Sequence, residues 1–279
     1  MSLFACPVCQ TMLTPAPRVW ACENGHHFDV ARQGYVNLLP VQFKHSKQPG
    51  DTPESLQARA AFFQAGHFQP LRDALQQCLE QFGPVAASLD LGCGEGYYTE
   101  ALRDHSDQVI GLDIAKAAIV QAIRQSPKTM PPIQWLVASG AHLPIANKSI
   151  DRLLSFFAPL PLAELQRVLK GEGHLIVARP AANHLTSFRK ALFGEIIKQD
   201  QDTSLTALGE AFQRVFLDTI DFELRLSPES LKQLLIMTPY GWKAQPERRQ
   251  ALIRQVETDG EWTTSASVQL SVWQGKPTL

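Results

Sequence analysis

The chain has 279 residues, a formal net charge of −1, and 44% hydrophobic against 19% charged residues. This length accommodates one large α/β domain and a small additional module, and the composition is ordinary for a globular enzyme. The near-neutral charge excludes a surface coated with cations for non-specific nucleic-acid binding, but it does not exclude a local basic patch.

The N-terminal residues, MSLFACPVCQTML, lack a charged segment followed by an apolar one, and no apolar run reaches about 18 residues. We therefore expect a cytoplasmic protein without a membrane segment. In that reducing compartment the five cysteines should not form disulfides.

Four side chains that bind metals are grouped near the N-terminus. Cys6, Cys9, Cys22 and His26 form the pattern C-x2-C-x12-C-x3-H, in which two knuckles can converge on one tetrahedral zinc ion. A complete Cys₃His set leaves no position for water or substrate, so the predicted zinc site is structural. His27 is an alternative fourth ligand on spacing alone.

The chain divides into three predicted regions. Residues 1–38 form the zinc-binding module, residues 39–83 a linker and helical lead-in, and residues 84–279 an α/β domain. The middle region contains a polar stretch (42–57) and then a helical pattern through Leu71, Leu75 and Leu79. We expect the glycine loop of the α/β domain to belong to a different hydrophobic core from that of the zinc module.

Strand and helix patterns alternate in the third region, which predicts a doubly wound, mainly parallel sheet with an edge hairpin. The predicted strands are 87–91, 108–114, 133–138, 150–156 and 174–179, followed by a late pair at 222–226 and 267–273. The predicted helices are 97–104, 116–125, 162–169, 185–197, 229–237 and 247–256.

The most informative stretch is residues 89–98, LDLGCGEGYY, in which a short strand leads into three glycines and a predicted helix. Glycines permit a tight turn and a close approach of the backbone to a ligand. A dinucleotide-binding loop would read G-x-G-x-x-G, and here the third glycine comes one residue early. Asp90 suits contact with a cationic aminoacyl group. Asp113, at the end of the next strand, suits ribose hydroxyls, with capping of the helix near Lys116 as its alternative role.

This stretch resembles motif I of the class I methyltransferases, and Gly111-Leu112-Asp113 resembles their second motif. Residues 137–145 look like the loop that packs against adenine, although Ser139 stands where many members carry an acid. Residues 165–173 look like the turn before the fifth strand, with Gly171-Glu172 in place of Pro-Gly. The resemblance implies a class I (Rossmann-like) methyltransferase that binds S-adenosylmethionine. The implied cofactor-binding residues in these motifs are Asp90, Gly92, Gly94, Glu95, Gly96, Asp113, Ala138 and Ser139.

With the zinc module included, nearly the whole chain resembles the bacterial 23S rRNA guanine-N1-methyltransferases. The matching segments include Cys6-Pro7-Val8-Cys9, residues 34–40 (GYVNLLP), residues 49–51 (PGD) and residues 65–71 (AGHFQPL). The resemblance implies methylation of a guanine in a hairpin of 23S rRNA, one structural zinc per chain and a homodimer. It also favours His26 over His27 as the fourth zinc ligand.

The same resemblance assigns three further residues. Phe68 stands at the position of an aromatic residue that contacts the cofactor, and it has no hydroxyl with which to donate a hydrogen bond. His184 matches a histidine near the cofactor and is the only titratable side chain we nominate as a general base. Phe157 is the candidate for stacking on a guanine extruded from the hairpin. Core packing is the alternative role for Phe157, and a surface position at a helix start is the alternative for His184.

Two other functions are compatible with the sequence alone. One is a small-molecule methyltransferase in which the zinc knuckle only stabilises the N-terminus, and the near-neutral charge favours it. The other is a non-catalytic docking protein, which the intact Asp90, glycine loop and Asp113 disfavour. Two stretches without acids, 32–48 and 173–194, are either RNA-binding patches or ordinary solvated faces. In the first of them, Lys44 and Lys47 are the candidate phosphate contacts.

Overall fold

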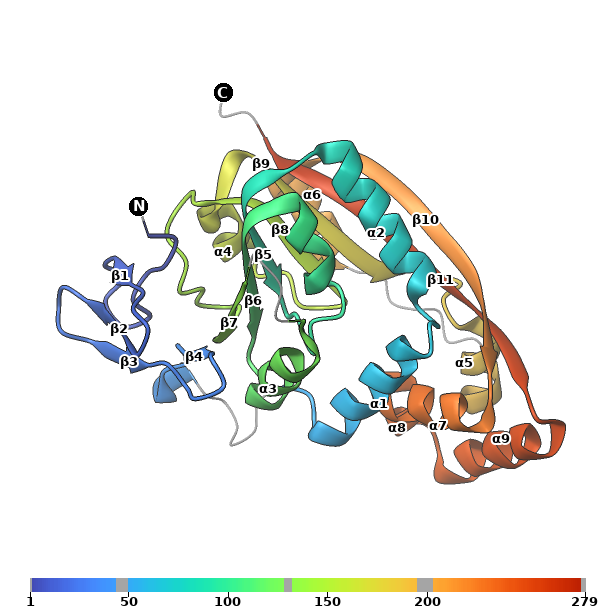
Figure 1. Cartoon of the computed structure of the whole chain (residues 1–279). Coiled ribbons are helices and arrows are strands. Elements are labelled where there is room, and N and C mark those ends of the chain that lie inside the picture. The colour runs from blue at the N-terminus through green and yellow to red at the C-terminus, as the bar shows by residue number, and fades with distance from the viewer. Residues whose placement is uncertain (1, 44–49, 128–131, 195–202, 277–279) are drawn as a thin grey trace.

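One mixed sheet of eight strands organises the computed structural model, which describes residues 2–43, 50–127, 132–194 and 203–276. The strand order is β10-β11-β9-β8-β5-β6-β7-β4 (Figure 1). The strands are β4 (Val36–Asn37), β5 (Val85–Leu91), β6 (Ser106–Asp113), β7 (Ile133–Val137), β8 (Ile150–Phe156), β9 (Leu169–Pro180), β10 (Phe212–Leu226) and β11 (Trp262–Gly275). Neighbours from β9 to β4 are parallel, whereas β11 is antiparallel to both β9 and β10. This arrangement confirms the predicted doubly wound sheet with an edge hairpin.

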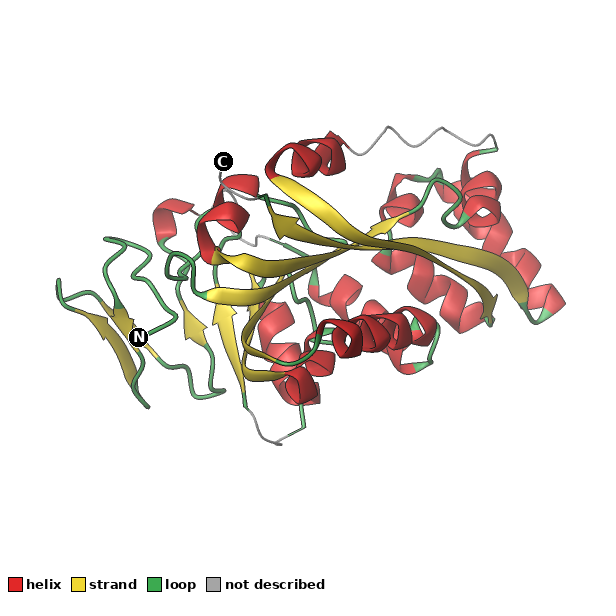
Figure 2. Ribbon diagram, turned by 90° about the horizontal axis from the view of Figure 1, so that it is seen from above, coloured by secondary structure: helices red, strands yellow, loops and turns green. Residues whose placement is uncertain are grey.

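Helices cover both faces of this sheet (Figure 2). They are α1 (Pro53–Gln64), α2 (Gln69–Phe82), α3 (Lys116–Gln125), α4 (Leu162–Val168), α5 (Thr186–Phe193), α6 (Thr203–Ala211), α7 (Pro228–Met237), α8 (Pro239–Lys243) and α9 (Pro246–Asp259), with 3₁₀ helices η1 (Val41–Phe43) and η2 (Thr99–His105). The helices α1, α7, α8 and α9 gather beside the far ends of β10 and β11 (Figure 1). Among the described residues no helix is long and apolar enough to cross a membrane.

Helix α2 follows directly from the sequence pattern, because Leu71, Leu75 and Leu79 lie on one face and are fully buried. Helix α1 was not expected, since it begins inside the polar stretch. Its start is set by Thr52, whose side chain accepts a hydrogen bond from the backbone N of Ser55, and by a proline at the first helical position. The start of α1 is therefore indicated by its capping residues and not by the spacing of apolar residues.

Several predicted elements differ from the structure; β9 and β11, for example, each begin five residues before the predicted start. The segment after the glycine loop is the 3₁₀ helix η2 rather than an α-helix. Strand β10 begins at Phe212, ten residues before the predicted start; most of its side chains are exposed at the sheet edge, so they lack an apolar alternation. Helix α5 spans Thr186–Phe193 and is capped by Gly194, and the rest of the predicted continuation, residues 195–197, lies outside the described residues.

The N-terminal module is joined to the large sheet. Its own small sheet contains β1 (Leu13–Thr14), β2 (Val19–Cys22) and β3 (His27–Asp29). The following strand, β4, pairs in parallel with β7, and the backbone N of Leu38 donates to the carbonyl of Val137 at 2.8 Å. A second connection is formed by Phe4, which makes a β-bridge to Ile145.

The module also shares its hydrophobic core with the α/β domain. Trp20 and Leu38, 2% and 1% exposed, belong to the same buried cluster as Leu89 and Ile110 from the central strands. The expectation of two separate cores is therefore wrong. A region of about forty residues buries too little apolar surface by itself, and here it completes its core against the sheet.

This shared core predicts that Leu38→Ala destabilises the whole chain. The side chain is buried, so the loss should be about 2–5 kcal/mol in the free energy of unfolding. Thermal unfolding should still give a single transition at a lower temperature. Val41→Ala, which removes methyl groups from an 80% exposed side chain in η1, is the control and should leave the midpoint nearly unchanged. Two transitions, of which only the first is shifted, would show independent modules.

Candidate cofactor pocket and metal centre

Cys6, Cys9, Cys22 and His26 bring their ligand atoms to within 4.8 Å of one another. The Sγ atoms of Cys9 and Cys22 are 3.7 Å apart, and the Nδ1 atom of His26 is 3.6 Å from the Cys6 Sγ and 3.4 Å from the Cys22 Sγ. Ligands about 2.3 Å from a tetrahedral ion are separated by about 3.8 Å, so this donor set fits zinc.

Two turns form the knuckles of this centre. The backbone N of Gln10 donates to the carbonyl of Cys6 at 2.8 Å, and that of Gly25 donates to the carbonyl of Cys22 at 3.0 Å. Gly25 has a φ of +77°, a conformation that glycine adopts without steric cost. The neighbouring His27 lies on β3 with an exposed side chain. The geometry thus brings His26, and not His27, to the cysteines.

A cavity of about 580 Å³ lies where the parallel strands β5, β6, β7 and β8 end. This volume is in the range of sites for small molecules and cofactors. Its walls are the glycine loop after β5, Asp113 and Ile114 after β6, residues 138–141 after β7 and residues 156–161 around the end of β8. Residues from outside the α/β domain complete it, namely Gly50, Asp51, Arg59 and Phe63.

The glycine loop is fastened by Asp113. The Oδ2 atom of Asp113 accepts a hydrogen bond from the backbone N of Gly94 at 2.9 Å, and Oδ1 accepts from that of Ala115 at 2.8 Å. Gly92 has a φ of +73°, and a Cβ there would lie 2.5 Å from the side chain of Ala158. Asp113 therefore supports both the loop and the start of α3, and its remaining lone pairs are free to accept from hydroxyl groups in the cavity.

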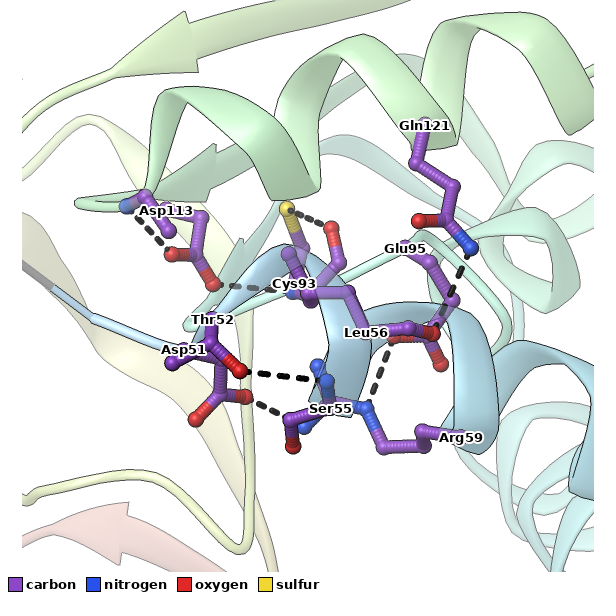
Figure 3. A network of polar contacts seen from close by, with 11 residues as sticks. Asp51, Thr52, Ser55, Leu56, Arg59, Cys93, Glu95, Asp113 and Gln121 are labelled. Carbon is purple, nitrogen blue, oxygen red and sulfur yellow. Dashed lines mark hydrogen bonds and ion pairs between the residues drawn. The ribbon is translucent and has the colours of Figure 1, made fainter. Parts of the chain in front are cut away.

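An ion-pair network ties helix α1 to the glycine loop (Figure 3). The Nε atom of Arg59 donates to Glu95 at 2.8 Å, and its Nη1 atom donates to Asp51 at 2.5 Å. Among the described residues that line the cavity, Arg59 is the only cation, beside the three acids Asp51, Glu95 and Asp113. Sequence reasoning missed Arg59, because its position in a polar stretch says nothing about which distant acid it meets.

Asp90 lies beneath the loop and is absent from the cavity wall. Its carboxylate is 2% exposed and accepts a hydrogen bond from the hydroxyl of Thr99 at 2.6 Å. Burial raises the pKa of Asp90 to about 7, and the nearby Asp113 and Glu95 add to the rise. Because the folded carboxyl holds its proton more tightly, its contribution to stability is complete below about pH 4 and is lost as the pH rises through about 7.

Aromatic side chains surround the mouth of the cavity. Phe157 is 40% exposed, lines the cavity and has a φ of +56°, which is unusual for a bulky residue. Phe68 is 4% exposed and contacts Phe157 edge to face, with ring centroids 6.3 Å apart. The ring centroid of Phe68 also lies 5.3 Å from that of Phe63 in α1. The strained backbone at Phe157 is the kind of feature found at ligand sites.

His184 lies away from the cavity wall. Its Nδ1 atom is 2.9 Å from the carbonyl oxygen of Ser267 on β11, and only 5% of the residue is exposed. Burial lowers the pKa of His184 to about 4, so the imidazole is neutral at physiological pH. A neutral imidazole can accept a proton in principle. Here, however, its Nδ1 atom faces the backbone of Ser267 on β11.

The structure thus brings only some of the predicted cofactor-binding residues to the cavity. The predicted residues that line the cavity are Gly92, Gly94, Glu95, Asp113, Ala138 and Ser139. The predicted residues that do not line it are Phe68, Asp90, Gly96 and His184. A Cβ at Gly96 would lie 2.8 Å from the ring of Trp135, so this glycine serves close packing of the loop.

Of the two stretches without acids, the second does not form a basic face. In the second, Arg179 and Arg189 are buried, and Arg179 donates to the carbonyl of Ala158. Lys190 is the exposed cation there. In the first stretch, Lys44 and Lys47 lie outside the described residues.

We predict one zinc ion per chain in the wild-type protein. Cys22→Ala removes one of four thiolate or imidazole ligands, and elemental analysis should then find far less than one zinc per chain. Cys78→Ala is the matched control, because that buried cysteine lies in α2 and should leave the zinc content at one. Wild-type protein without stoichiometric zinc would contradict the assignment.

We predict that Asp113→Ala weakens S-adenosylmethionine binding about ten- to a hundredfold, because both the loop contact and the acceptor for ribose hydroxyls are lost. Calorimetric titration measures the affinity. Asp107→Ala, which removes an exposed acid from the same strand, should bind normally. An unchanged affinity combined with a lower melting temperature would limit Asp113 to its structural hydrogen bonds.

Comparison with known protein families supports the assignment of both the zinc module and the methyltransferase domain. A family model described as "RlmA, N-terminal", a zinc ribbon, matches residues 4–47, and a model described as "Methyltransferase domain" matches residues 89–177. The first range contains all four clustered ligands, and the second contains the glycine loop and Asp113. The protein therefore uses S-adenosylmethionine and zinc as cofactors.

Solved structures agree on the fold. The YcgJ protein from Bacillus subtilis superimposes with a TM-score of 0.51 at 15% identity, covering 74% of this chain and 98% of that one. At this identity the likeness shows the class I methyltransferase fold alone.

Relatives match along nearly the full length. The 23S rRNA (guanine(748)-N(1))-methyltransferase of Streptomyces fradiae is 30% identical, covering 98% of this chain and 96% of the relative. The YxjB protein of Bacillus subtilis, provisionally named a 23S rRNA (guanine-N(1)-)-methyltransferase, is 32% identical, covering 92% of this chain and 93% of the relative. The chain belongs to the family of 23S rRNA guanine-N1-methyltransferases, class I enzymes that depend on S-adenosylmethionine and carry an N-terminal zinc ribbon.

Proposed function

We propose that this protein transfers a methyl group from S-adenosylmethionine to N1 of a guanine in a hairpin of 23S rRNA. The observation that carries the proposal is the similarity over nearly the whole chain to relatives named for this reaction. Two features of the cavity support the proposal. Asp113 fastens the glycine loop, and the exposed Phe157 lines the cavity.

The cavity residues divide the binding of the cofactor among them. Asp113 would accept hydrogen bonds from the ribose hydroxyls, and the backbone around Ala138 and Ser139 would pack against the adenine. Arg59 holds Glu95 and Asp51, so that helix α1 forms part of the cavity wall. When bound, S-adenosylmethionine supplies an electrophilic methyl group.

The nucleophile needs positioning and a route for its proton. N1 of guanine is protonated at neutral pH, and that proton must leave to a base or to water as the new N–C bond forms. In this proposal Phe157 stacks on the extruded guanine and holds N1 in line with the methyl group. His184, the base nominated from the sequence, does not line the cavity, and burial lowers its pKa to about 4, so it accepts a proton poorly and water is the proposed acceptor.

The zinc module has no open coordination position, so its proposed role is to support the fold and to contact RNA. Because 23S rRNA is the substrate, the proposal places the protein in the cytoplasm. A homodimer is part of the proposal on the strength of the resemblance, and sedimentation measures it.

Incubation of the zinc-loaded protein with labelled S-adenosylmethionine and undermodified 23S rRNA tests the function. We expect one methyl group per rRNA and a stop in primer extension one nucleotide before the modified guanine, because N1-methylation blocks Watson–Crick pairing. The Asp113→Ala variant should incorporate less label at limiting cofactor. Label appearing only in small molecules, or nowhere, would contradict the proposal.

A further inference from the structure

Trp242 is an unusual surface residue. It lies on α8 and is 64% exposed, whereas Trp20, Trp135 and Trp273 are each 5% exposed or less. Tryptophan side chains are highly buried on average, and tryptophan is enriched at interfaces.

The backbone that carries Trp242 is fixed by close packing. Pro239 begins α8, and a Cβ at Gly241 would lie 1.8 Å from the carbonyl oxygen of Leu235 in α7. Ala244, which follows the helix, is buried. The backbone of this corner is therefore fixed before a ligand binds, so binding needs to order only the Trp242 side chain.

One cation lies beside the indole, and two more lie on neighbouring helices. The Nζ atom of Lys243 is 5.8 Å from the centroid of the Trp242 ring. Helix α5 packs against α8 and carries the exposed Lys190, and the exposed Arg248 of α9 has its guanidinium beside Gly194 at the end of α5. Glu247 is an exposed acid in the same first turn of α9, so the cations outnumber the acids. Trp242, Lys243, Lys190 and Arg248 are called the α8 surface below.

We propose that the α8 surface binds an unpaired nucleotide of the RNA substrate, with its base stacked on Trp242 and its phosphates near the three cations. Aromatic stacking combined with positive charge is the pattern by which proteins bind single-stranded RNA. Charge complementarity favours this polyanion over a second copy of the chain, whose net charge is only −1. The inference rests on the proposed function, since it takes the same RNA as the ligand.

The position of α8 suits this role. Helix α1 contributes Arg59 and Phe63 to the cofactor cavity and packs along α7, which in turn packs on α8 (Figure 1). The α8 surface is thus connected through two packed helices to the cavity, outside the set of residues that contact the cofactor. It can hold a nucleotide that flanks the target hairpin while the guanine enters the cavity.

The test compares Trp242→Ala and Trp242→Phe with the wild type in steady-state methylation of 23S rRNA. We expect Trp242→Ala to raise KM for the RNA between about five- and a hundredfold, and to leave kcat and S-adenosylmethionine affinity unchanged. Trp242→Phe should restore most of the loss, because phenylalanine also stacks. Leu217→Ala is the matched control, since it removes a 45% exposed apolar side chain from β10.

A second readout does not depend on turnover. Trp242 is exposed, so an unmodified 23S rRNA fragment should quench its fluorescence, and the quenching should be lost in Trp242→Phe and weakened by salt. Quenching without any methylation would support the α8 surface and refute the proposed function. Normal methylation with an unchanged KM for RNA in Trp242→Ala would overturn the inference and leave the function intact. Altered sedimentation of Trp242→Ala with unchanged RNA binding would overturn it in favour of an interface between copies.

Discussion

The hydrogen-bonded edge between β4 and β7 is the contact on which the rest of the structure depends. It places the zinc module at the edge of the sheet, where the backbone N of Leu38 donates to the carbonyl of Val137. The two residues that follow Val137, Ala138 and Ser139, line the cofactor cavity. Phe43 stacks on His142 at 4.2 Å just beyond that loop. Because a strand pairing and a shared core join the two parts, the metal centre supports one wall of the cavity, although its closed ligand shell does no chemistry.

The cavity illustrates a second constraint, which is that the groups that bind the cofactor also hold the backbone. Asp113 binds two backbone N–H groups before any ligand arrives, so the loop is already in place and binding orders little more of it. The buried Asp90 is kept at a raised pKa under the same loop. Acids are concentrated here at a cost to stability, as is common at functional sites.

Much of this was readable from the sequence. The four zinc ligands, Cys6, Cys9, Cys22 and His26, are close in sequence, so their spacing was enough to predict the site. The central strands were predicted because they are short apolar runs. The glycine loop and Asp113 were predictable because adjacent parallel strands end at one edge of a sheet.

What spacing did not reveal depends on long-range packing. Arg59 meets Glu95 across 36 residues of sequence, and no local pattern specifies that pair. Arg179 and Arg189 lie in a stretch expected to be either an RNA-binding patch or a solvated face, but they are buried against backbone carbonyls, because polar burial is decided by tertiary partners. The shared core was missed for the same reason, since strand β4 is only two residues long.

The central claim, that the zinc module supports the cofactor cavity, is tested most directly by amide hydrogen exchange with and without bound zinc. Removal of zinc should raise exchange in β4 and also in β7 and residues 138–146, because these segments are hydrogen-bonded to the module. An increase confined to residues 1–38, with β7 and the cavity loop still protected, would contradict it.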